Sequence, residues 1–326
     1  MGLKEREEID KDTSGMVSGF ITKTNSFNII SIFKFLIIFA MIDCVFQISL
    51  GGFVRVSGSG LGCPDWPLCF GKIIPPMNYH TLIEWGHRTS GVILGLTISV
   101  ITLLAWATQR SNVTLVALTT FNLILVITVG GIGGAVVLTE LEPSLRTLHL
   151  FLAQMIILVL GFSLITLLVQ SPESLSRNIK LDKYSITMGL AALTIIITLL
   201  SGSYAVWKGA GTVCSAWPFC TSESIFPKSS LGWIHMIHRG FSYISVVVGA
   251  VACYIVIKAK FNNTVSYISL VTLIVIVGQI ILGALNPWTK FEVWVRVAHL
   301  GVASILWGLI ATLFCIISIE KFRYKI

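Results

Sequence analysis

Long apolar segments separated by short polar stretches follow one another along the whole chain. A helix needs about 20 mostly apolar residues to cross the hydrocarbon core of a bilayer. Eight segments meet this requirement, at residues 30–54, 85–107, 113–138, 147–169, 185–206, 233–257, 265–286 and 294–318. The pattern predicts an all-α polytopic membrane protein with eight transmembrane helices.

The second half of the chain repeats motifs of the first half. The repeated motifs are a cysteine pair around Trp-Pro, a His-Arg dipeptide and an Arg-x-x-His sequence. They are Cys63–Cys69 and Cys214–Cys220, His87-Arg88 and His238-Arg239, and Arg146-x-x-His149 and Arg296-x-x-His299. The offset is 151 residues for the first two motifs and 150 for the third. A nearly constant offset over three motifs indicates an internal repeat, so we expect two pseudo-symmetric four-helix bundles.

The repeat divides the chain into two helical halves with short flanking segments. The first half should cover residues 29–170 and the second half residues 185–320. The remaining segments are an N-terminal stretch at 1–28, a linker at 171–184 and a tail at 321–326.

Composition supports an integral membrane protein. Hydrophobic residues make up 55% of the chain, charged residues 12%, and the mean hydropathy is +0.87. A soluble domain needs a polar outside, which this composition excludes. The net charge of +8 would suit nucleic acid, but the basic residues gather in loops on one side, as the positive-inside rule expects. We therefore predict no nucleic-acid partner.

The basic residues also give an orientation. With eight spans both termini share one side, which holds 14 of the 23 basic residues, while nine lie on the other side. We therefore place both termini in the cytoplasm and the cysteine loops outside. Residues 1–15 mix acidic and basic side chains and fit neither a signal peptide nor a mitochondrial presequence. We expect the plasma membrane of a bacterium or archaeon.

Two cysteine pairs lie in loops of the expected outer side. An oxidising compartment favours the short disulfides Cys63–Cys69 and Cys214–Cys220. Four thiolates could instead hold zinc, but five-residue gaps filled by Trp-Pro suit a zinc knuckle poorly. A structural and a redox-active role for the disulfides both stay open.

Four histidines stand at the starts of the predicted even-numbered helices. They are His87, His149, His238 and His299. A histidine within a membrane helix is costly and usually functional. One pair per half near the outer leaflet suits axial ligation of haem iron, with one imidazole on each side of the ring. A bare zinc or copper ion would normally recruit more donors.

Arginines accompany all four histidines. They follow a histidine directly or precede one by three residues, and are Arg88, Arg146, Arg239 and Arg296. Haem propionates need cationic partners near the water interface, so we interpret these arginines as propionate contacts. Snorkelling arginines at the membrane interface are the alternative interpretation.

The two halves differ at one position beside the first histidine of each pair. Glu84 precedes His87 by three residues, and its equivalent in the second half is His235. A carboxylate in a low-dielectric pocket is costly unless it is used, so we predict that Glu84 shuttles protons or positions an oxygen species. The alternative is a helix N-terminal charge favoured by the helix dipole. The role of His235 stays open.

Further polar and glycine residues in the spans suggest packing roles. Five polar side chains should face the bundle interior and bond between helices: Asp43, Gln47, Asn122, Gln154 and Gln279. The glycine-rich runs at 51–52 and 130–134 are interpreted as close-packing surfaces, because no Lys-Ser/Thr follows them as in a phosphate loop.

The first outer loop and the next helix carry the most specific pattern in the chain. It reads GGFVRVSGSGLGCPDWPLC from Gly51 to Cys69, continues with Pro75-Pro76 and ends with Glu84-x-x-His87-Arg88. This pattern resembles the first outer loop of the haem A synthase family. The second Cys-x-x-Trp-Pro-x-Cys motif and the four histidines also match, so the similarity covers about residues 30–318.

The resemblance implies an activity and a set of ligands. The family oxidises the C8 methyl group of haem O by successive hydroxylations, and loss of water leaves the formyl group of haem A. The resemblance implies that His238 and His299 hold a haem b cofactor in the second half. It also implies that His87 and His149 receive the substrate haem, with Glu84 as the catalytic carboxylate. The implied partners are haem O, haem O synthase and an electron donor, and a homo-oligomer stays open.

Two other functional classes are compatible with the residues alone. A di-haem b-type electron-transfer protein explains the four histidines but leaves Glu84 without a purpose. A transporter built from parallel repeats would need a polar pathway at mid-membrane, whereas the ionisable residues here gather near one face. The choice of haem O as substrate rests on the resemblance alone.

Overall fold

The computed structural model describes the backbone of residues 3–168 and 181–319, and the side chains from residue 29 onward within these ranges. The described residues form eight α-helices: α1 (Leu3–Val56), α2 (Tyr79–Thr108), α3 (Val113–Leu138), α4 (Pro143–Leu168), α6 (Lys183–Trp207), α7 (Ser230–Lys258), α8 (Asn263–Trp288) and α9 (Val293–Ser318). Each helix contains a segment long and apolar enough to cross a membrane; in α1 this segment is Ile29–Val56. The prediction of an all-α, eight-span membrane protein is confirmed. Residues 171–180 of the predicted linker and the predicted tail 321–326 lie outside the described residues.

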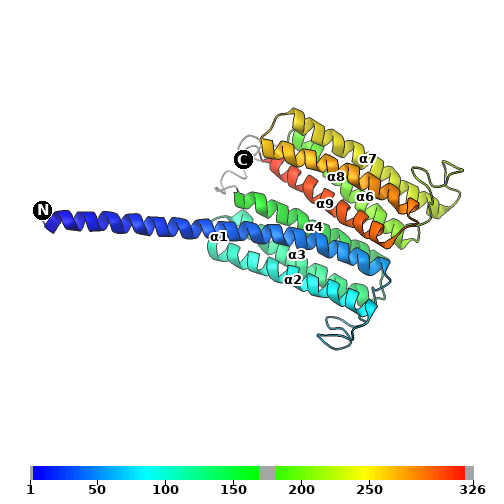
Figure 1. The fold of residues 1–326 in the computed structure, drawn as a ribbon, viewed down its shortest axis with the longest axis horizontal. Coiled ribbons are helices and arrows are strands. Elements are labelled where there is room, and N and C mark those ends of the chain that lie inside the picture. The colour runs from blue at the N-terminus through cyan, green and yellow to red at the C-terminus, as the bar shows by residue number, and fades with distance from the viewer. Residues whose placement is uncertain (1–2, 169–180, 320–326) are drawn as a thin grey trace.

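The eight helices form two groups of four. Helices α1–α4 lie together, α6–α9 lie together, and α4 and α9 face each other between the groups (Figure 1). In the most apolar segments of α4 and α9, 56% and 50% of the residues are buried, against 22–33% in the other six helices. These two helices therefore form the centre of the molecule.

A polar contact on equivalent residues joins the two central helices. Gln154 Nε2 of α4 donates a hydrogen bond of 2.8 Å to Ser304 Oγ of α9, and Trp307 Nε1 donates one of 2.8 Å to the Gln154 carbonyl. Gln154 and Ser304 are 150 residues apart, so they occupy the same position in the two halves. The halves thus meet around a pseudo-twofold relation at these residues.

The connections repeat in backbone detail as well. The turn between α3 and α4 contains two non-glycine residues at positive φ, Glu140 (54°) and Leu141 (70°). The turn between α8 and α9 contains Lys290 (54°) and Phe291 (64°) at the equivalent positions. In each turn the N–H of the second residue donates at 2.7 Å to the carbonyl five positions earlier, as does the 6→1 bond of a Schellman motif at a helix C-terminus.

Several helices begin at polar residues that lie before the predicted apolar segments. Asn78 accepts a hydrogen bond from the Thr81 N–H at the start of α2, and Ser229 accepts one from the Gly232 N–H at the start of α7. Such N-caps satisfy backbone donors that have no partner within the helix. Helices α2 and α7 therefore begin at residues 79 and 230 instead of 85 and 233. His87 consequently lies about two turns inside its helix.

The predicted interior polar residues bond between helices in four of five cases. Gln47 and Gln279 donate to the carbonyls of two of the repeated histidines, His87 and His299, at 2.9 and 3.1 Å. Asp43 accepts from Ser90 Oγ at 3.5 Å, and Gln154 bonds across the centre as described above. The fifth residue, Asn122, is buried and has no side-chain partner among the described residues.

Candidate functional site

Each repeated histidine packs its ring against a glycine of the preceding helix. A Cβ atom built on each glycine would lie close to the imidazole Cε1. The distances are 3.0 Å for Gly51 and His87, 3.2 Å for Gly133 and His149, 2.8 Å for Gly202 and His238, and 3.6 Å for Gly283 and His299. The glycines repeat with the same offsets as the histidines. The four imidazoles therefore lie between helices inside the bundles, against the backbone of the neighbouring helix.

His238 is the one repeated histidine whose Nδ1 has a hydrogen-bond partner among the described residues. Ser201 Oγ of α6 lies 3.0 Å from His238 Nδ1. The Nδ1 atoms of His87, His149 and His299 are buried without such a partner. A hydrogen bond at one ring nitrogen fixes the ring orientation and tautomer, so the Ser201 contact orients His238.

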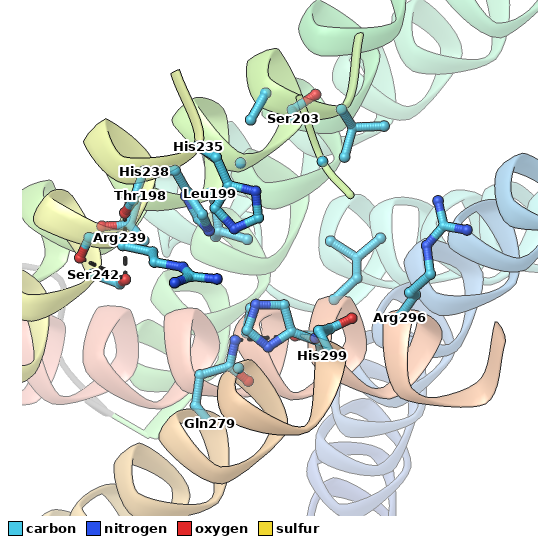
Figure 2. Close-up of a pocket in the computed structure, with 18 of the residues that line it drawn as sticks. Thr198, Leu199, Ser203, His235, His238, Arg239, Ser242, Gln279, Arg296 and His299 are labelled. Atoms are coloured by element: carbon cyan, nitrogen blue, oxygen red, sulfur yellow. Dashed lines mark hydrogen bonds between the residues drawn. The ribbon is translucent and has the colours of Figure 1, made fainter. Parts of the chain in front are cut away.

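A cavity of about 530 Å³ lies among the last four helices, between His238 on α7 and His299 on α9. Figure 2 shows the two imidazoles approaching this cavity from facing helices, with Arg239 beside them. The volume falls within the range of about 300–1,000 Å³ that is typical of small-molecule and cofactor pockets. The two histidines can therefore bind one group from opposite sides.

The charges that line this cavity all have the same sign. Its lining contains Arg55, Arg239 and Arg296 but no aspartate or glutamate. Where the structure describes side chains, the one salt bridge joins two other residues, Arg88 and Glu84. Cations at a partly buried site without counter-ions are costly, so the cavity favours an anionic ligand. Two imidazoles and surplus arginines fit a haem, which offers iron to the former and two propionates to the latter.

The guanidinium of Arg88 holds the first cysteine loop. Arg88 Nη1 donates to the carbonyls of Asp65 and Leu68, both at 2.6 Å, and Nη2 donates to the Cys63 carbonyl at 3.0 Å. Cys63 and Cys69 form a disulfide in this loop, as predicted. The loop is thereby fixed directly to the helix turn that carries His87.

Arg239 repeats this arrangement in the second half. Its Nη1 donates to the carbonyls of Ala216, Pro218 and Phe219 at 2.8, 3.1 and 2.7 Å. The Cys214–Cys220 disulfide closes this loop, which confirms the second predicted pair. Arg239 also lines the cavity, so it connects the loop to the space between the histidines.

Glu84 and its equivalent His235 have different surroundings. Glu84 is 5% exposed and its Oε1 accepts from Arg88 Nε at 3.0 Å. The other carboxylate oxygen has no hydrogen bond to the described residues. His235 is 8% exposed, its Nδ1 lies 2.9 Å from the Ala210 carbonyl, and it lines the cavity. The first half therefore has a buried carboxylate–guanidinium pair where the second half has an imidazole bonded to the loop.

The remaining two arginines differ from each other. Arg296 lines the cavity, whereas Arg146 stacks on Trp207 of the other half, with 3.4 Å from its Cζ to the ring centroid. The Trp207 ring is held in turn, because its Nε1 donates to Ser203 Oγ at 2.9 Å. Contacts of the four arginines with propionates stay a prediction.

Sequence analysis did not identify Arg55 and Ser201 as site residues. Gly51 and Gly133 were predicted only to be packing residues, and the sequence pattern did not single out Gly202 and Gly283. Gly52 and Gly134 do pack closely, against Leu300 and Trp66. The recurrence of Gly51 as Gly202, 151 residues later, was the available signal for the glycine–histidine contacts.

Asp65 stabilises the tip of the first cysteine loop and gives a testable pH dependence. Its two carboxylate oxygens accept the backbone N–H groups of Phe70 and Gly71 at 2.6 and 2.7 Å. These bonds, the one from Gly71 first, hold the Asp65 pKa below its usual value. The contribution is therefore complete above the unfolded-state pKa of about 3.9 and is lost as the pH falls through the lowered folded-state pKa.

Asp65→Ala should consequently speed amide hydrogen exchange at Phe70 and Gly71 at neutral pH. Exchange measured by mass spectrometry checks this. Glu142→Ala is the control, because Glu142 is an exposed carboxylate whose side-chain hydrogen bonds stay within its own helix start, at Ser144. Unchanged protection of the two amides in Asp65→Ala would contradict the assignment.

Known proteins with similar sequences match this chain over most of its length. A heme A synthase of Bacillus pumilus is 27% identical over 287 residues, which cover 84% of this chain and 91% of the relative. Heme A synthases of Macrococcus caseolyticus and Geobacillus kaustophilus are 27% and 24% identical over 306 and 272 residues. These matches cover 88% and 81% of this chain, and 98% and 84% of the relatives. Residues 34–311 match the cytochrome oxidase assembly protein family, and because this range includes all four histidines and both cysteine loops, the chain belongs to that family.

Proposed function

We propose that this chain is a haem A synthase, which oxidises the C8 methyl group of haem O to a formyl group. Relatives with this name match it over most of their length. The observation that carries the proposal is the asymmetry of the duplicated halves. Beside its first histidine, one half has the buried carboxylate of Glu84, while the other has His235. Two identical electron-transfer sites would not need this difference.

The second half, residues 185–320, binds haem b as a resident cofactor in this proposal. His238 and His299 are its axial ligands, and Arg239 and Arg296 contact its propionates. The cavity between these residues, with its surplus of positive charge, supports the assignment. When bound, the haem supplies one-electron redox chemistry that no protein side chain here offers.

The first half, residues 29–170, binds the substrate haem. His87 and His149 orient it, and Glu84 holds or accepts a proton at its free carboxylate oxygen beside the reacting group. Arg88 fixes the other oxygen of Glu84 and also the disulfide loop. Contacts of Arg88 and Arg146 with substrate propionates are part of the proposal. The apolar helices around the site exclude bulk water from the reaction.

The proposal also includes the orientation of the chain in the membrane and its expected partners. The start of α1 and the two cysteine loops lie at opposite ends of the molecule (Figure 1). The distribution of basic residues then favours cytoplasmic termini and extracytoplasmic cysteine loops in a bacterial or archaeal plasma membrane. Haem O synthase and an electron donor are the expected partners, and a homo-oligomer is compatible with this arrangement.

Expression in a host that makes haem O but lacks an enzyme for its oxidation tests the proposal. Chromatography of the extracted haems should show haem A only when the chain is present. A membrane protein that carries haem but yields no haem A from haem O would refute the activity. That outcome would instead favour the di-haem electron-transfer interpretation.

The close contact between Gly202 and the His238 ring gives a testable prediction. In Gly202→Ala the new methyl group would meet the His238 ring at 2.8 Å, inside normal contact distance. The imidazole must then shift, and we expect a weakened or shifted visible absorption band of the resident haem. Gly283→Ala is the matched control, because its methyl group would meet His299 at an ordinary 3.6 Å. Identical spectra in both variants would contradict the role of Gly202.

A further inference from the structure

Arg55 belongs to the first four helices but lines the cavity of the last four. It lies in the last turn of α1, and the same cavity is lined by Arg296 and His299 of α9. Small residues bring α1 and α9 together just before this point. A Cβ atom built on Gly52 would lie 2.9 Å from Leu300 Cδ2, and one built on Gly301 would lie 2.6 Å from Ser49 Oγ. The close helix contact allows Arg55 to reach across the boundary between the halves.

The charge of Arg55 has no partner within the described protein. Its Nε is buried and makes no hydrogen bond to the described residues. The cavity lining contains no carboxylate that could pair with it. Arg88 and Arg239 differ in this respect, because they donate to loop carbonyls. Arg146 Nε is also buried without a hydrogen bond, but its guanidinium stacks on Trp207. Arg55 as a whole is partly buried, and a partly buried guanidinium without such contacts is costly unless a ligand supplies the anion.

The repeat does not provide the first half with a matching arginine. The residue 151 positions after Arg55 is Val206, which also lines the cavity. The second-half site therefore receives a cation from its neighbour, whereas the equivalent position of α6 offers the first-half site none. The two halves therefore differ in charge at this position as well as at the position of Glu84 and His235.

We infer that Arg55 binds a propionate of the haem held between His238 and His299. The inference rests on the haem site of the proposed function, but not on the reaction catalysed there. A planar guanidinium matches a carboxylate through two parallel hydrogen bonds. The first half thus contributes a binding residue to the cofactor of the second half, and the last turn of α1 influences that cofactor directly.

The charge has a measurable consequence for the haem. Reduction removes one positive charge from the iron, so a nearby fixed cation stabilises the reduced form. Arg55→Gln should therefore lower the midpoint potential of the resident haem in the purified full-length protein, measured by spectroelectrochemical titration. The same variant should release haem to excess apomyoglobin about tenfold faster, because one charge-assisted hydrogen-bonding partner is lost. Arg55→Lys keeps the charge and should largely restore the potential.

Arg110→Gln is the matched control. Arg110 is exposed beyond the end of α2 that lies opposite the cysteine loops, and it bonds only the Trp106 carbonyl, so neither readout should change. An unchanged potential in Arg55→Gln overturns the inference, even if haem release is faster, because packing alone would explain that result. Failure of the wild-type chain to make haem A would refute the proposed activity and leave the Arg55 titration valid.

Discussion

Glutamine in place of Glu84 is expected to leave haem O bound while conversion to haem A falls by about 10²–10⁴-fold, the usual cost of removing a positioned proton-transfer group. The side chain is buried, and one oxygen is already taken by Arg88 Nε at 3.0 Å. Glutamine has nearly the same shape and still offers an oxygen to Arg88, so the local fold should persist. What it lacks is a carboxylate that can hold or release a proton.

Haem extraction and chromatography from cells that supply haem O measure both outcomes at once. The haem O that co-purifies with the variant reports binding, and the haem A peak reports conversion. Glu223→Gln is the control, since this carboxylate is exposed and lies in the loop between α6 and α7, in the other half of the chain. If the Glu84 variant gave the wild-type yield of haem A, the catalytic role of this residue would be contradicted.

Features that depend on local sequence could be predicted without the structure. The eight spans follow from apolar length, and the paired loops and histidines follow from the repeat itself. The helix starts were less accurate, because caps such as Asn78 and Ser229 are polar and extend helices beyond their apolar segments. The depth of His87 within α2 was underestimated for this reason.

Features that depend on contacts between distant segments could not be predicted in the same way. A charge pattern shows that Arg88 and Arg239 stand beside histidines, but not that loop carbonyls return to bind them. Arg55 was counted only as one of the basic residues of the outer side. Its position in the second-half cavity depends on the close packing of α1 against α9 through Gly52 and Gly301, which no single-helix pattern contains.

Alanine at His238 or His299 is expected to abolish the absorption of the resident haem, whereas alanine at His87 or His149 should preserve that absorption and stop conversion of haem O. The first two imidazoles line the cavity of the last four helices and are its proposed haem ligands. In the proposed assignment, loss of either would leave the iron with one protein ligand, and we expect the three lining arginines alone not to retain the haem. The other two imidazoles lie in the first half, against Gly51 and Gly133, where the substrate is proposed to bind.

Reduced-minus-oxidised spectra of the four purified variants, compared with haem chromatography, separate the two sites. His80→Ala is the control, because His80 is exposed, its Nδ1 contacts Ser59 in the loop between α1 and α2, and neither residue lines the cavity. The repeat provides an internal comparison for each variant. His87 and His238 occupy equivalent helix positions in the two halves, as do His149 and His299, but the members of each pair have different expected roles. Equal loss of pigment in all four variants would contradict the division into a cofactor half and a substrate half, because it would mean that both pairs hold resident haem.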